Sequence, residues 1–202
     1  MKKLATAIAL AFVAGAASAS AITYKTGAGF ESDKDSATYE QDVSTLVGKS
    51  PIETLASFND ASFGLSNSAF ETTITFDVTS PTTYDFRAGV DFGGGGTMIL
   101  DGTTALATNG NNMWWNNSYS DTTQFLAGTA NLSVGVHTLT LYGFEDCCSG
   151  NMQVQFSTDK GNSFTSFASN DGLPAVPEAQ NVAMLLAGLG LVGTLARRRK
   201  QA

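Results

Sequence analysis

The sequence predicts an all-β fold, an antiparallel β-sandwich or jelly roll, in the middle of the chain. Short runs of residues alternate between apolar and polar, which is typical of strands with one buried face. Turn signals such as Ser80-Pro81 and Asp101-Gly102 separate these runs at fairly regular spacing. Once the two apolar ends of the chain are set aside, about 155 residues remain, which is enough for one domain with its own core.

The chain begins with a predicted secretory signal peptide, residues 1–21. Two lysines precede an apolar run from Leu4 to Val13, and small residues follow through Ala21. This order of a basic, an apolar and a small-residue region is typical of a segment that a signal peptidase removes. Cleavage fits after Ala19 or after Ala21. We therefore expect export through the Sec translocon.

The predicted sandwich spans residues 22–170. Its early part, from Glu31 to Ser50, is acidic and weakly apolar, and we expect a long loop or an irregular edge there. The first clear strand runs from Glu71 to Thr79, because Ile74, Phe76 and Val78 fall on one face and polar residues fall on the other.

A second strand follows the turn and continues the alternation. Its outward positions are Asp85, Arg87 and Asp91. Its inward positions are Tyr84, Phe86, Ala88, Val90 and Phe92. The glycines at 93–96 predict a flexible link, and residues 97–100 then run into the hairpin signal Asp101-Gly102.

The last strands lie between residues 136 and 167. In the run from Val136 to Phe144, Leu139 and Leu141 face one way, whereas Tyr142 and Phe144 face the other. Met152–Phe156 and Phe164–Phe167 complete the predicted set.

Three stretches of this region carry a resemblance to a known fold. They are YDFRAGVDFGGGGTMILDGT from Tyr84, NNMWWNN from Asn111 and LSVGVHTLTLYGFE from Leu132. Together they resemble the protective-antigen and flocculin type of β-sandwich over roughly residues 72–167. Flocculin-type members bind sugars through a calcium ion held by two adjacent aspartates. Asp91 stands alone before Phe92 in this sequence, so that calcium site does not carry over.

A linker and a membrane-spanning tail are predicted after the sandwich. Residues 171–179 contain two prolines and no periodicity, which is typical of a linker. Residues 180–202 then predict an apolar transmembrane helix and a basic tail. Eighteen helical residues from Ala179 span about 27 Å, barely enough for the ~30 Å hydrocarbon core. A buried helix of a soluble domain is the alternative.

Four consecutive cations predict the orientation of this tail. By the positive-inside rule they remain in the cytoplasm and place the sandwich on the outer side of the membrane. They are Arg197, Arg198, Arg199 and Lys200.

The order of a Pro-Glu step, an apolar run and a terminal ARRRK resembles the PEP-CTERM sorting signal of exported bacterial proteins. Pro177 and Glu178 match the motif, and Ala179 stands where the family has a second proline. The resemblance implies recognition by an exosortase and cleavage near the motif. Cys147-Cys148-Ser149-Gly150 also matches the CCxG signature of one PEP-CTERM subfamily.

Cys147 and Cys148 are the only cysteines of the chain. In an oxidising compartment we expect them to pair. A trans peptide holds neighbouring Cα atoms about 3.8 Å apart, below the usual range of about 4.4–6.8 Å for disulfides. A vicinal disulfide would therefore be a strained, stiff and apolar knob at a loop tip. Intermolecular pairing and free or metal-binding thiols are the alternatives.

Two adjacent tryptophans form the candidate glycan-binding site. Trp114 and Trp115 offer aromatic faces for stacking, and the flanking amides could reach sugar hydroxyl groups. These amides belong to Asn111, Asn112, Asn116 and Asn117. In the favoured alternative, one tryptophan lies in the core and the other at its rim, while the asparagines support turns.

A calcium site is a further hypothesis, and the sequence predicts no other cofactor or metal. Five acidic residues could supply oxygen ligands, although none has EF-hand spacing. They are Asp91, Asp101, Asp121, Glu145 and Asp146.

Two further motifs favour structure over catalysis. The segment from Ser157 to Phe164 matches the Asp-box pattern, in which the aspartate bonds the backbone of its own hairpin. His137 is the sole histidine, and neither a GxSxG elbow nor an HExxH motif accompanies it. We therefore expect no enzymatic activity.

The charge of the exported part narrows the choice of partners. Between Ile22 and Glu178, five cations face eighteen acidic residues, a net charge of −13. Phosphate backbones would be repelled, so we expect no nucleic-acid partner.

These expectations define a non-enzymatic protein of the envelope or extracellular matrix, with exopolysaccharide binding as a further hypothesis. It would first be anchored in the inner membrane with the sandwich in the periplasm. After tail processing it would lie at the cell surface or be secreted. A calcium-dependent lectin-like module or a secreted hydrolase is the alternative.

Overall fold

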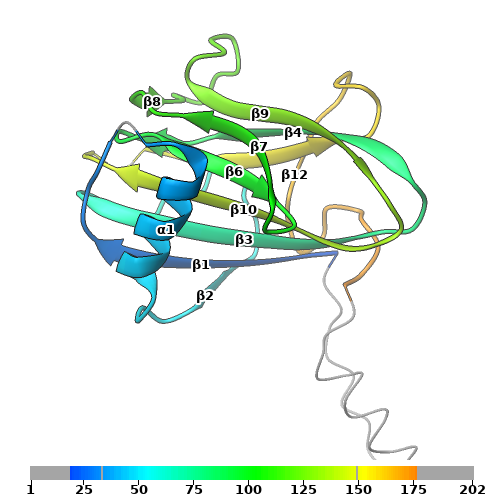
Figure 1. Ribbon diagram of the computed structural model, residues 1–202. Helices are drawn as coiled ribbons and strands as arrows, with labels where there is room; N and C mark the ends of the chain where they lie inside the picture. The colour runs from blue at the N-terminus through cyan, green and yellow to red at the C-terminus, as the bar shows by residue number, and fades with distance from the viewer. Residues whose placement is uncertain (1–18, 33, 149, 177–202) are drawn as a thin grey trace, which may run out of the picture. The chain divides into compact units, whose positions relative to one another are not determined.

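Two antiparallel sheets form the layers of a β-sandwich, which confirms the predicted fold class (Figure 1). The computed structural model describes residues 19–32, 34–148 and 150–176. The Pro177-Glu178 motif, the predicted tail at 180–202 and nearly all of the predicted signal peptide lie outside the described residues. Within the described part of the chain, no helix has the length and apolar character needed to cross a membrane.

The larger sheet has six strands in the order β2-β1-β3-β10-β6-β7. In chain order they are β1 (Ser20–Ala28), β2 (Glu53–Leu55), β3 (Ser68–Val78), β6 (Gly96–Leu100), β7 (Thr104–Asn109) and β10 (Gly135–Glu145). Asp101 and Gly102 both have positive φ in the turn between β6 and β7, which confirms the predicted hairpin.

The smaller sheet has four strands in the order β12-β11-β4-β9, and a separate two-stranded ribbon pairs β5 with β8. The strands of the smaller sheet are β4 (Thr82–Gly89), β9 (Phe125–Leu132), β11 (Gln153–Ser157) and β12 (Thr165–Ser166). The ribbon is made of β5 (Asp91–Phe92) and β8 (Met113–Trp114).

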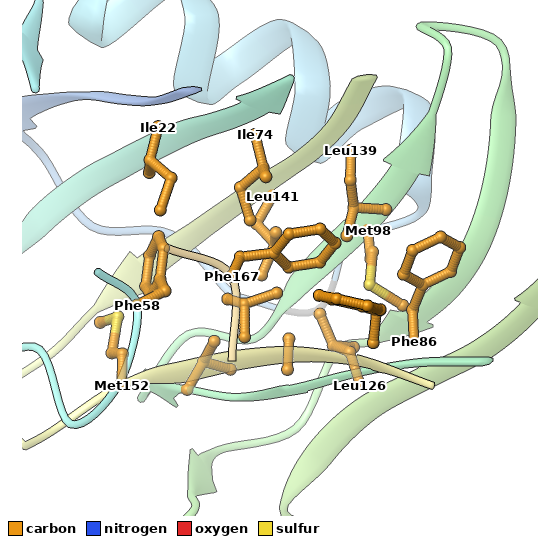
Figure 2. Close-up of a cluster of buried hydrophobic side chains, with 14 of the residues drawn as sticks. Ile22, Phe58, Ile74, Phe86, Met98, Leu126, Leu139, Leu141, Met152 and Phe167 are labelled. Carbon is orange, nitrogen blue, oxygen red and sulfur yellow. The ribbon is translucent and has the colours of Figure 1, made fainter. Parts of the chain in front are cut away.

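The main core fills the space between the two sheets. Alternate residues of β3 and β4 face it, as the sequence predicts: Ile74 and Phe76 from one sheet meet Phe86 from the other. Figure 2 shows side chains of this cluster, among them Ile22, Phe58, Met98, Leu126, Leu139, Leu141, Met152 and Phe167. Burial of these apolar surfaces is the main force that holds the layers together.

A helix occupies part of the segment that the sequence analysis assigns to a loop. Helix α1 (Ser36–Val47) begins after Asp35, whose carboxylate accepts a hydrogen bond of 2.8 Å from the Thr38 N–H. Tyr39, Val43 and Val47 lie four residues apart, so they form one apolar stripe. The expectation of a loop between residues 31 and 50 is therefore wrong over these twelve residues, because so narrow a stripe leaves most of the helix polar.

Helix α1 covers the outer face of the larger sheet, across β1, β3, β6 and β10 (Figure 1). Its apolar stripe packs against Ala69 and Phe144, which point away from the main core. The opposite orientations predicted for Leu141 and Phe144 are therefore confirmed, and each faces its own apolar cluster.

The four glycines between Phe92 and Thr97 form a tight, buried turn rather than the flexible link expected from the sequence. The Tyr39 hydroxyl donates a hydrogen bond of 2.6 Å to the Gly94 carbonyl, and the Gly94 N–H donates to Phe144 O at 2.9 Å. A Cβ atom at Gly94 would overlap the Glu31 carbonyl oxygen. Close approach of neighbouring backbone, and not mobility, requires glycine here.

Both ends of the predicted sandwich extend beyond its expected limits of Ile22 and residue 170. Strand β1 begins at Ser20, which pairs with Phe76. The Ser20 hydroxyl donates to the Asp171 carboxylate at 2.6 Å, and the same carboxylate accepts from the Leu173 N–H. The first residues of the predicted linker are therefore attached to the sandwich.

The contact between α1 and the glycine turn yields a stability prediction. Replacing Tyr39 with phenylalanine removes the donor to the buried Gly94 carbonyl, which should lower the free energy of unfolding by about 1–3 kcal/mol. Urea titration followed by circular dichroism measures the change. Tyr24→Phe is the matched control, because it removes a solvent-exposed hydrogen bond to Glu53 and should cost less. Equal losses in both variants would contradict the role given to the buried bond.

Candidate functional site

A cavity of about 410 Å³ lies where three separate segments of the chain meet. Strand β8 and the C-terminal end of β10 lie at the same end of the sandwich (Figure 1). The segments are β5 with the start of the glycine turn, β8 with the residue before it, and the loop after β10. The lining residues are Asp91, Gly93, Asn112, Trp114, Asp146, Cys147, Cys148 and Gly150.

The two tryptophans have opposite environments. Trp114 is 60% exposed and lines the cavity, whereas Trp115 is 4% exposed and packs against Gly89, which has no side chain to obstruct it. Successive residues of an extended chain point to opposite faces, so the rings of these two neighbouring residues lie on opposite sides of the chain. Their arrangement confirms the favoured interpretation of one tryptophan in the core and one at the rim.

Hydrogen bonds fix the strand that carries Trp114. The Trp114 N–H donates to the Gln124 side-chain oxygen at 2.7 Å, and Trp114 pairs with Asp91 in the β5–β8 ribbon. The backbone that carries the exposed ring is therefore fixed, and the ring lines the same cavity as Asp91, its strand partner.

Asn116 and Asn117 are the central residues of a turn and do not line the cavity. Both have positive φ, a conformation that asparagine adopts more readily than most residues, and the Ser118 N–H closes the turn on Trp115 O at 3.0 Å. The structure therefore separates the predicted surface: Trp114 and Asn112 line the cavity, whereas Trp115, Asn116 and Asn117 do not.

A second hollow of about 330 Å³ contains Trp115 and Asn117. Here the Arg87 guanidinium lies 3.8 Å from the ring centroids of both Tyr119 and Phe164. Arg87 Nε donates to the Gln155 side-chain oxygen at 2.7 Å. Burial raises the pKa of Tyr119 to about 12. These contacts tie the loop after β8 to the smaller sheet.

Cys147 and Cys148 form a disulfide with each other, which confirms the predicted vicinal pair. Their Cα atoms are 3.7 Å apart, and Cys148 has a positive φ of 77°. Both residues are exposed at the loop tip and line the cavity, so the pair supplies one apolar wall. Ser149 of the CCxG motif lies outside the described residues.

The Cys147–Cys148 loop is held at both of its sides. On one side, the Asn67 N–H donates to the Asp146 carbonyl at 2.8 Å. On the other, the Gly150 N–H donates to the Asp91 carboxylate. A Cβ atom at Gly93 would overlap the Asp146 side chain, so glycine permits this loop to approach the turn.

Asp91 is buried, and the expectation that it faces outward is wrong. Strand β4 ends at Gly89, after which the chain leaves the smaller sheet and pairs with β8, so the alternation does not continue. Asp91 is 8% exposed and lines the cavity. Burial raises its pKa, and the hydrogen bond from the Gly150 N–H opposes that shift. Only one of its oxygens, Oδ2, has a hydrogen-bond partner within the described part of the chain.

The five predicted calcium ligands are dispersed. Asp101 binds His137, and Asp121 accepts from the N–H and hydroxyl of Thr123. Asp91 and Asp146 line the cavity, and Glu145 is buried at the end of β10. No group of three or more His, Cys, Asp or Glu residues suited to a metal ion occurs among the described residues.

The Asp-box is the structural hairpin that the sequence predicts. The Asp159 carboxylate accepts from the Ser163 N–H at 3.0 Å and from the Ser157 and Ser163 hydroxyls. These hydrogen bonds lower the pKa of Asp159 to about 2. Lys160 and Gly161 carry the positive φ values of the turn.

Gly93, Asp146 and Gly150 are cavity residues that the sequence interpretation assigns to no glycan site. They are distant from Trp114 in sequence. The one signal for them is weak: Asp146 is an acidic residue directly before the double cysteine. Only the fold brings them together.

Several solved structures share this fold. The PA14 domain of the MpAFP antifreeze protein has a TM-score of 0.51 and 11% identity, covering 84% of this chain and 94% of that chain. A PA14 sugar-binding domain from an RTX adhesin has a TM-score of 0.50 and 12% identity, covering 75% and 97%. An anti-sigma factor domain-containing protein from Clostridium clariflavum has a TM-score of 0.50 and 11% identity, covering 79% and 48%.

The chain therefore has the architecture of a PA14-type β-sandwich, which confirms the predicted fold resemblance. The sequence matches no protein-family model. No curated protein matches it either. At such low identity the structural likeness shows the fold alone.

His137 supplies a pH-dependent contribution to stability. Burial lowers the pKa of His137, but hydrogen bonds to Asp101 at 2.8 Å and to the Ser133 carbonyl at 3.0 Å, with the Asp101 and Asp77 charges, raise it overall. A raised folded-state pKa stabilises the fold fully below the unfolded pKa of about 6.5, and this stabilisation is lost as pH rises through the folded-state pKa.

We therefore expect the free energy of unfolding of the native protein to fall between about pH 5.5 and about pH 8.5 relative to that of His137→Gln, because these values lie about one unit below and about two units above the ordinary histidine pKa of about 6.5. Urea unfolding at several pH values measures the difference. Asp101→Asn should remove most of the pH dependence while retaining the histidine. Parallel curves for the native protein and His137→Gln would contradict the assignment.

Proposed function

We propose that this protein is an exported, non-enzymatic component of the cell surface or extracellular matrix that binds carbohydrate in the cavity beside Trp114. The observation that carries the proposal is an exposed indole ring at the wall of a cavity whose other walls hold polar groups. Carbohydrate sites combine an aromatic face for the C–H side of the sugar with a few placed hydrogen-bonding groups.

The cavity offers both kinds of contact. Trp114 and the Cys147–Cys148 disulfide supply apolar walls, while Asp91 and Asn112 supply a carboxylate and an amide for hydroxyl groups. The PA14 architecture supports the proposal, because one solved structure that shares it is a PA14 sugar-binding domain from an RTX adhesin. The ligand would be a polysaccharide outside the cell.

The two ends of the chain support export and sorting. A signal peptide cut after Ala19 would leave strand β1, which begins at Ser20, intact in the mature protein. The Pro177-Glu178 motif and the basic cluster at Arg197–Lys200 would then hold the protein in the inner membrane until an exosortase processes it. The sandwich would lie in the periplasm and later at the surface or in the medium.

A calcium-dependent lectin-like module is the second candidate. The observation that favours it is the presence of the Asp91 and Asp146 carboxylates and the Asn112 amide in one cavity. Calcium takes six to eight oxygen ligands, so sugar hydroxyls and water would have to complete such a site. Binding measured with added calcium and with chelator separates the two candidates.

Trp114→Ala tests the carbohydrate site. Exposed aromatic residues that anchor a ligand typically carry a large share of its binding energy, so we expect a loss of affinity of about tenfold or more. A glycan array followed by calorimetry on its best ligand measures this, with and without calcium. Ile52→Ala is the control, because Ile52 is 66% exposed and does not line the cavity. Unchanged affinity in Trp114→Ala, or no glycan ligand at all, would contradict the proposal.

Processing of the tail is a separate prediction. We expect the mature protein to end near Pro177 to Ala179, without the ARRRK cluster. Intact-mass spectrometry of envelope and medium fractions measures the C-terminus. Replacing Pro177 and Glu178 with alanine should leave the tail attached. In the control variant Pro174→Ala, the tail should still be removed. Full-length C-termini in every fraction would indicate a permanent anchor instead.

A further inference from the structure

We propose that the cavity selects a cationic amino sugar, a hexosamine with a free ammonium group, and that Asp91 is the anchor for that ammonium. This inference rests on the proposed carbohydrate-binding function and specifies the class of sugar. It comes from the charges of the lining residues, the burial of Asp91 and the apolar character of the remaining walls.

The charged residues that line the cavity are all acidic. Asp91 and Asp146 line it, and no basic residue does so within the described part of the chain. The exported segment around it carries a net charge of −13, so the long-range field has the same sign. A uronate or a sulfated sugar would be repelled, whereas a sugar with an ammonium group would be attracted.

Asp91 is a buried carboxylate with an unused oxygen. It is 8% exposed, its Oδ2 accepts from the Gly150 N–H, and Oδ1 has no hydrogen-bond partner among the described residues. None of the salt bridges in the described part involves it. Oδ1 is not enclosed by the protein, and Asp91 lines the cavity, so a charged partner with N–H donors can reach it there and offset the cost of burying most of the carboxylate. The raised pKa of Asp91, caused by burial, agrees with a site that lacks its positive partner.

Asp146 adds a second carboxylate at the exposed edge of the cavity. It is held near Gly93 by the hydrogen bond from the Asn67 N–H to its own carbonyl. Since its side chain is exposed, its contribution is attraction over a distance and is weakened by salt. The two carboxylates thus have different roles: Asp91 fixes the ammonium, and Asp146 increases the attraction.

The apolar walls favour a sugar over a bare metal ion. An indole face attracts both C–H groups and cations, and a hexosamine ring offers both. The vicinal disulfide lines the same cavity and adds sulfur and carbon atoms to its apolar surface. A calcium ion would require six to eight oxygen ligands, and the lining side chains supply two carboxylates and one amide.

The test is calorimetry on the purified full chain with four probes of equal length. They are a glucosamine tetramer, its fully N-acetylated form, a galacturonate tetramer and tetralysine, each measured once with chelator and once with added calcium. We expect the glucosamine tetramer to bind at least tenfold more tightly than the acetylated form, and galacturonate not to bind. The preference should shrink in high salt. Weak binding of tetralysine would agree with a need for the sugar ring.

Two variants test the separate roles of the Asp91 and Asp146 carboxylates. Asp91→Asn retains an oxygen for the Gly150 N–H, and it should remove most of the preference for the free amine while acetylated sugar still binds. Asp146→Asn is exposed and should reduce the preference by a smaller factor. Asp60→Asn is the matched control, because it removes one exposed charge outside the cavity. Circular dichroism and the melting temperature check that each variant is folded.

The outcomes separate the two levels of the proposal. Equal or tighter binding of the acetylated tetramer overturns the selection for an ammonium group but leaves carbohydrate binding in place. Equal binding of tetralysine overturns the sugar as the ligand. An unchanged preference in Asp91→Asn overturns the anchor. If none of the sugars binds, with or without calcium, the carbohydrate function fails as well.

Discussion

The burial of the C-terminal half of strand β10 on both of its faces is the constraint on which the rest of the structure depends. This strand pairs with β3 on one side and β6 on the other. Leu139 and Leu141 enter the core between the sheets, whereas Phe144 packs under helix α1. A strand covered on both faces is among the least free elements of a domain. The loop that carries the vicinal disulfide follows directly from it, so its starting point is fixed by the core.

The same constraint reaches the cavity through the glycine turn. Gly94 is bonded to Phe144 of β10 and to Tyr39 of the helix, and Gly93 next to it lines the cavity. The helix therefore acts on the site without touching it, because it fixes the turn that forms one wall. Side chains on rigid elements need little ordering when a ligand binds, and this reduces the entropy cost of recognition. Trp114, whose backbone is held by Gln124, benefits in the same way.

The sequence predicts the layers of this fold well, because alternation reports directly on a face that is buried by a partner sheet. It did not find helix α1, whose apolar stripe is only three residues, Tyr39, Val43 and Val47. It also misplaced Asp91, because alternation assumes that a strand continues, and β4 stops at Gly89. The cavity itself depends on long-range pairing that no local pattern encodes.

The identity of residue 91 is informative about function for a physical reason. Asparagine at this position would retain an oxygen for the Gly150 N–H and would avoid the burial of a charge. Within the described residues the charge of Asp91 has no partner of opposite sign, so the burial of most of this carboxylate lacks that compensation. Local choices that cost stability without a compensating contact are concentrated at functional sites. The missing compensation at Asp91 is a positive charge, and the cavity beside it is where a ligand can supply one.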